Sequence, residues 1–133
     1  MSKIKAIITR IDSVESLNIV TFDFYGTILK MMSLDLSEEI EVGRKVTLAV
    51  KPSHIAIAKE FSGMVSYSNQ LKATIHSCDN GKLLSSIKLR IEDVMLESII
   101  TLESVLKMDL KAGDEVTAMI KASELSIVDV LDD

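Results

Sequence analysis

An internal repeat constrains the fold of this chain more than any other feature of its sequence. Residues 42–57 align without a gap with residues 112–127, and a glycine, valine, threonine, lysine, serine and isoleucine coincide. Residues 5–8 match residues 72–75 more weakly. Self-similarity at a fixed spacing indicates one structural unit that occurs twice. We therefore predict two domains, at residues 1–59 and 60–133.

The hydrophobic pattern within each repeat has a period of two. Apolar and polar side chains alternate over residues 46–50, 87–91 and 116–120, which is typical of half-buried strands. Many short strands in a unit of this size favour a small barrel. The predicted fold class is all-β, with two small OB-type barrels in tandem.

One short helix is predicted in each repeat. In the second repeat it covers Leu102 to Met108, with Thr101 as N-cap and Gly113 at the turn into the next strand. A weaker counterpart in the first repeat covers Ser33 to Glu39, with Gly43 as its turn.

Composition excludes several classes of protein. The net charge of −5 is spread along the chain, without the basic cluster that a nucleic acid requires. The start of the chain lacks the apolar core of a signal peptide, and no apolar run approaches the length that spans a bilayer. We expect a cytoplasmic protein without membrane insertion. Because 47% of its residues are hydrophobic and the chain is short, we also expect a homodimer or homotrimer.

Catalytic and metal-binding constellations are not recognisable. His54 and His76 lie in different repeats, with no cysteine or histidine at ligand spacing. Cys78 precedes the turn signal Asn80-Gly81, and its acidic neighbour Asp79 would not activate a thiol. No nucleophile elbow or phosphate loop occurs. We expect a binding protein and not an enzyme.

The second repeat carries two motifs that resemble those of the Mop/TOBE family of molybdate-binding domains. Residues 98–113, followed by Val116-Thr117-Ala118-Met119-Ile120-Lys121-Ala122-Ser123, are similar to a helix start, a glycine turn and a strand of that family. Residues 68–72, Ser-Asn-Gln-Leu-Lys, resemble its other motif. The first repeat resembles the looser TOBE pattern of transporter ATPases, mainly through residues 46–53.

The resemblance implies binding of molybdate or tungstate at module interfaces of a homo-oligomer. The oxyanion site that it implies consists of Ser66, Tyr67, Ser68, Asn69, Thr101, Ser104, Lys121, Ala122 and Ser123. These residue types suit the ligand, because a tetrahedral dianion needs several hydrogen-bond donors and one full positive charge. Hydroxyls beside the free amides of a helix start favour an anion, and Lys121 supplies the charge.

Without the resemblance, simpler interpretations hold. Thr101 and Ser104 would be a helix cap, Lys121 would be a solvated charge, and Glu103 would oppose an anion. One departure from the family also stands out, since Ser68 occupies the place of an arginine and so removes a bidentate donor. The first repeat is the more degenerate copy, with only Lys51 and Ser53 as partial equivalents.

Three functions compete at this point. The first is molybdate or tungstate storage, buffering or sensing. The second is a regulatory protein-interaction module of a transport or regulation system with a vestigial anion site, which the loss of the arginine favours. The third, single-stranded nucleic acid binding, is disfavoured by the net charge.

Overall fold

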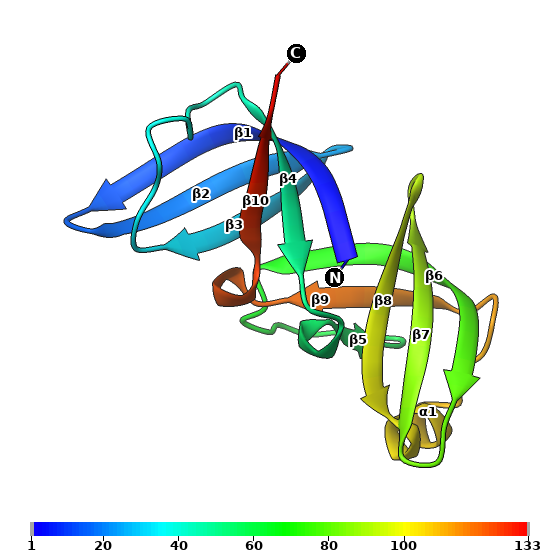
Figure 1. The fold of residues 1–133 in the computed structure, drawn as a ribbon. Helices are drawn as coiled ribbons and strands as arrows, with labels where there is room; N and C mark the ends of the chain where they lie inside the picture. The colour runs from blue at the N-terminus through cyan, green and yellow to red at the C-terminus, as the bar shows by residue number, and fades with distance from the viewer. Residues whose placement is uncertain (1, 133) are drawn as a thin grey trace.

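A computed structural model describes residues 2–132 and contains two five-stranded antiparallel sheets (Figure 1). The first sheet has the order β10-β4-β1-β2-β3 and consists of β1 (Ser2–Val14), β2 (Leu17–Phe24), β3 (Thr27–Ser33), β4 (Lys45–Val50) and β10 (Ser126–Leu131). The second has the order β5-β9-β6-β7-β8 and consists of β5 (Ala56–Ala58), β6 (Asn69–Asn80), β7 (Leu84–Ile91), β8 (Val94–Thr101) and β9 (Glu115–Ile120). The prediction of tandem OB-type all-β barrels is confirmed.

Each sheet takes one edge strand from the other repeat. A 3₁₀ turn, η1 (Pro52–His54), follows β4 and carries the chain to β5, which pairs with β9. Its counterpart η2 (Ala122–Glu124) follows β9 and carries the chain to β10, which pairs with β4. In Figure 1 the red strand β10 therefore lies beside β4, although it follows β9 in sequence. The sheets thus cross the predicted division between residues 59 and 60.

Equivalent polar side chains connect the two barrels at both ends of this exchange. Asn69 is wholly buried, and its amide forms two hydrogen bonds with the backbone of Lys30 on β3, of 2.6 Å from the Lys30 amide and 3.0 Å to the Lys30 carbonyl. At the equivalent place in the other repeat, the Ser2 hydroxyl accepts a 2.8 Å hydrogen bond from the Glu97 amide on β8. The edge strand β3 of the first sheet is therefore bound by β6 of the second, and the edge strand β8 of the second sheet by β1 of the first.

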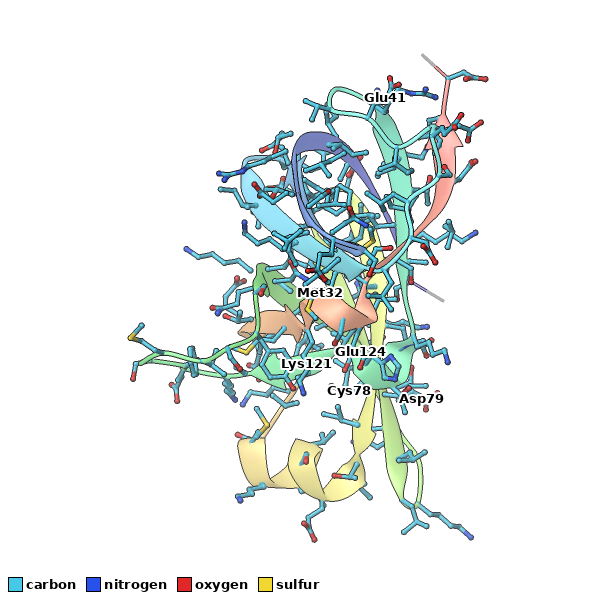
Figure 2. All side chains as sticks on the ribbon, turned by 90° about the vertical axis from the view of Figure 1, so that its left-hand side faces the viewer. Met32, Glu41, Cys78, Asp79, Lys121 and Glu124 are labelled. Carbon is cyan, nitrogen blue, oxygen red and sulfur yellow. The ribbon has the colours of Figure 1, made fainter. Side chains whose placement is uncertain are left out.

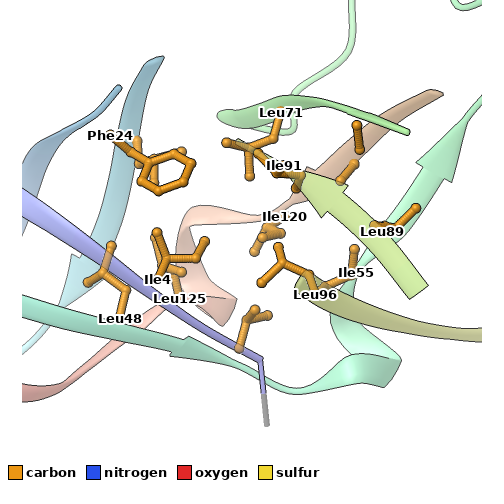
Figure 3. Close-up of a cluster of buried hydrophobic side chains, with 14 of the residues drawn as sticks. Ile4, Phe24, Leu48, Ile55, Leu71, Leu89, Ile91, Leu96, Ile120 and Leu125 are labelled. Atoms are coloured by element: carbon orange, nitrogen blue, oxygen red, sulfur yellow. The ribbon is translucent and has the colours of Figure 1, made fainter. Parts of the chain in front are cut away.

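One hydrophobic core runs through both barrels. Ile4 and Leu48 of the first sheet belong to the same cluster of buried side chains as Leu71 and Ile120 of the second (Figure 3). A barrel of this size is only marginally stable alone, because it buries a smaller fraction of its surface than a larger domain does, and the shared core increases that burial. The alternation predicted from sequence supplies these side chains, because successive residues of a strand face opposite sides.

The two repeats differ most in their helical segment. The second contains α1 (Leu102–Met108) with Thr101 as N-cap, as predicted. The helix predicted around Ser33–Glu39 is wrong, because β3 ends at Ser33 and no helix lies between it and β4 at Lys45. Equivalent positions of the two repeats are 67 residues apart before this segment and 70 apart after it. The first repeat is therefore shorter here than the second, and the segment is too short for a helix. The Ser33 hydroxyl instead donates to the carbonyl of Asp35, 2.8 Å away.

Each exchanged strand is followed by a charged residue that lies near an opposite charge in the barrel that the strand joins. Lys59, which follows β5, forms a 3.0 Å ion pair with Asp114 and donates to the carbonyls of Met108 and Asp109 at the end of α1. Asp132, which follows β10, lies 3.9 Å from Arg44. Arg44 and Asp114 are equivalent in the repeat. Without the exchange, Lys59 would lie near Arg44 and Asp132 near Asp114, so that like charges would meet.

We predict that Asp114→Asn lowers the free energy of unfolding at neutral pH. The hydrogen bond from Lys59 is the main cause that holds the pKa of Asp114 below its ordinary value. A depressed carboxyl pKa stabilises the fold above its unfolded value, and the stabilisation is lost as the pH falls through the folded value. Urea denaturation should therefore show a gap between wild type and variant that closes in acid.

The matched control is Asp109→Asn, because the exposed carboxylate of Asp109 forms an ion pair with Lys111, which is exposed as well. An equal loss in both variants at pH 7 would contradict a special role for Asp114.

Candidate functional site

Lys121 stands at the centre of the candidate site, at the end of β9. Its ammonium lies 5.9 Å from the centre of the Tyr67 ring, in the geometry of a cation–π contact. Both residues line a pocket of about 320 Å³ between the barrels. Figure 2 shows Lys121 close to Glu124, at the level where the barrels meet. The pocket is lined by Ser53, His54, Ile55, Ala56, Tyr67, Ile100, Lys121 and Glu124.

The serines predicted beside Tyr67 are available to a ligand, whereas the side chain of Asn69 is not. Ser66 and Ser68 are exposed in the segment before β6. Asn69 is buried and uses its amide on the backbone of Lys30. The backbone carbonyl of Tyr67 accepts a hydrogen bond from Gln70.

Ala122 and Ser123 follow Lys121 in η2, but Ser123 faces a different hollow. Ser123 lines a pocket of about 490 Å³ that also contains Ser33, at the end of β3, and Asp35 and Ser37 from the segment that follows. That hollow is the counterpart of the Lys121 pocket in the other repeat, since Ser33 and Ser123 are equivalent to Ile100 and Ser53.

Thr101 and Ser104 lie apart from Lys121 within one chain. Thr101 accepts a 3.2 Å hydrogen bond from the Ser104 amide and contacts the Ser104 hydroxyl at 3.0 Å, which caps α1. Thr101 lines a separate pocket of about 600 Å³ with Leu83, Leu84 and Leu106. Successive strand residues face opposite sides, so Ile100 faces the Lys121 pocket and Thr101 does not. No hydrogen bond or ion pair among residues 2–132 joins Thr101 or Ser104 to Lys121.

Of the pocket residues that were not predicted from the sequence to belong to the site, His54 and Glu124 are the two with ionisable side chains. His54 Nδ1 and Glu124 Oε2 are 2.8 Å apart, and each side chain is 36% exposed. They occupy equivalent positions, in η1 and η2, so the two repeats meet at this pair. The opposite charges at equivalent positions were the only sequence signal for it.

Metal binding and thiol chemistry find no support in residues 2–132. No group of histidine, cysteine and acidic side chains is arranged to hold a metal ion within that range. Burial, assisted by the charge of Asp114, raises the pKa of the Cys78 thiol, which disfavours the reactive thiolate. Nor is any helix in residues 2–132 long and apolar enough to cross a membrane.

Comparisons with known proteins agree with this architecture. Residues 66–127 match the TOBE domain model. The chain is 29% identical over 110 residues to the molybdate/tungstate import ATP-binding protein WtpC of Pyrococcus horikoshii. The aligned region covers 83% of this chain and 32% of that protein. The chain thus spans about a third of that relative's length.

Two solved structures of molybdate-binding proteins are also similar. The cytoplasmic protein ModG, solved with molybdate bound, superposes with a TM-score of 0.88 at 22% identity, over 94% of this chain and 93% of ModG. The two share their fold. A molybdate-binding protein of Sporomusa ovata is 33% identical, with a TM-score of 0.49, over 50% of this chain and 98% of that one. The match to the TOBE domain thus covers most of the second repeat and leaves the first repeat outside it.

We predict that Thr101→Val destabilises the protein by about 1 kcal/mol, which is the usual contribution of an N-cap hydroxyl. Valine has nearly the same shape but cannot accept the hydrogen bond of the Ser104 amide. Thr101→Ser keeps the acceptor and should remain close to wild type. Chemical denaturation measures both, and equal stability of all three proteins would show that the cap contributes nothing.

Proposed function

We propose that the protein binds molybdate or tungstate in the cytoplasm, for storage, buffering or sensing, and that it acts by binding and not by catalysis. The observation that carries the proposal is Lys121, placed beside Tyr67 and exposed serines in a pocket between the barrels. The anions named for WtpC and ModG belong to the same class of ligand.

The chemistry of these residues suits a dianion that is held and released unchanged. Lys121 contributes a full positive charge, and Ser66 and Ser68 contribute hydroxyl donors from an exposed segment. Hydrogen bonds to a charged group contribute roughly 1.5–3 kcal/mol each, so a few of them support micromolar affinity. With a serine at position 68, the site relies on Lys121 for its charge more than a site with an arginine would.

A second copy of the chain would complete the site, because Thr101 and Ser104 cannot reach the Lys121 pocket of their own chain. Both groups are bordered by exposed apolar side chains. Phe61, Met64 and Val65 precede the serines, and Met64 is completely exposed. Leu83 (81% exposed), Leu84 and Leu106 (68% exposed) surround Thr101. Burying one apolar surface against the other would bring hydroxyls of one copy to Lys121 of the next.

Titration calorimetry with molybdate, tungstate, sulfate and phosphate tests the function. We expect binding of the first two, and a loss of about ten- to a hundredfold in affinity for Lys121→Ala, because a charge-assisted hydrogen bond is removed. The fold should be retained, since the Lys121 side chain is exposed. Lys3→Ala removes an exposed lysine outside the pocket and should bind as wild type does. Absence of binding by wild type would favour the interaction module instead.

Light scattering tests the assembly. We expect a dimer or trimer for wild type and a shift toward monomer for Met64→Asp, because a charge would replace an apolar contact between copies. Lys5→Asp, an exposed substitution on β1 away from both apolar surfaces, should leave the assembly unchanged. A wild-type monomer at micromolar concentration would contradict a site completed by a second copy.

A further inference from the structure

The ion pair of His54 and Glu124 lies in the same pocket as Lys121. His54 comes from η1 of the first repeat, whereas Glu124 and Lys121 come from the end of the second. Their 2.8 Å contact fixes the imidazole beside the carboxylate, within the pocket that Lys121 and Tyr67 line. Figure 2 shows how Glu124 and Lys121 lie near each other between the barrels.

Glu124 creates an electrostatic problem for an anion site. Its carboxylate would repel a dianion, and its formal charge cancels that of Lys121. Among the residues that line the pocket, only His54 can add a second positive charge. An imidazole ordinarily gains or loses its proton between pH 5 and 8. The charge that an oxyanion would meet therefore depends on the protonation of one histidine.

We infer that His54 is a positioning residue of the oxyanion site, whose imidazolium neutralises Glu124 and allows the dianion to approach Lys121. The inference rests on the proposed function. When His54 loses its charge, Nδ1 can still donate to the carboxylate, but the negative charge of Glu124 is no longer compensated. Oxyanion affinity should consequently be lower when the imidazole is neutral than when it is charged.

Among the described residues that line the pocket, no other side chain can take this role. Tyr67, from the segment before β6, carries a phenol, and Lys121, at the end of β9, carries the ammonium that the anion itself would meet. Ile100 of β8 is apolar, and the other lining residues, Ser53, Ile55 and Ala56, do not titrate. A pH-dependent affinity between pH 6 and 8 would thus report on His54.

Titration of the purified protein with molybdate at pH 6 and pH 8 tests the inference. Wild type should bind about three- to tenfold more weakly at pH 8, as expected for the loss of one partly screened charge. His54→Gln should bind weakly at both values, and His54→Arg, which is always charged, should bind tightly at both. His76→Gln is the matched control, because His76 is exposed on β6 and does not line the pocket, and it should keep the wild-type ratio.

Glu124→Gln provides a second, independent variant. It removes the repulsion without touching the imidazole, so its affinity at pH 8 should exceed that of wild type. A wild-type ratio retained in His54→Gln, or weak binding by His54→Arg at pH 8, would overturn the role of His54 and leave the proposed function intact. No molybdate binding by wild type at either pH would overturn the proposed function and this inference with it.

Discussion

The reciprocal exchange of edge strands is the constraint on which the rest of the structure depends. Because β5 pairs with β9 and β10 pairs with β4, neither barrel is complete without residues of the other repeat. The buried Asn69 amide and the Ser2 hydroxyl strengthen this arrangement by holding the opposite barrel's edge strand. A buried amide left without partners would cost more than its bonds contribute, so the contact specifies one arrangement of the barrels.

The exchange also creates the candidate site. The crossings at η1 and η2 bring equivalent positions of the two repeats together, which is how His54 meets Glu124. The pocket around Lys121 therefore contains side chains from both repeats, and it could not exist in an isolated single repeat. The same crossings place Ser123 in the counterpart hollow, away from Lys121.

The residues that the resemblance assigns to one oxyanion site have different roles in this structure. Asn69 links the barrels, and Thr101 caps α1, while Lys121 and the serines before β6 remain open to a ligand. Alternation along β8 turns Thr101 away from the Lys121 pocket. The residues that the resemblance groups into one site are thus distributed over two surfaces of one chain, and contact between copies would bring them together.

The sequence by itself determined the strands, the repeat, the turn glycines and the cap of α1, because periodicity, left-handed turns and capping are local properties. Gly43 and Gly113 adopt the positive φ angles, of 95° and 93°, that their turns require. Only the tertiary structure decided which strand completes which barrel and that His54 lies beside Glu124. Those outcomes depend on pairing between residues about 70 positions apart, for which a single sequence contains no local signal.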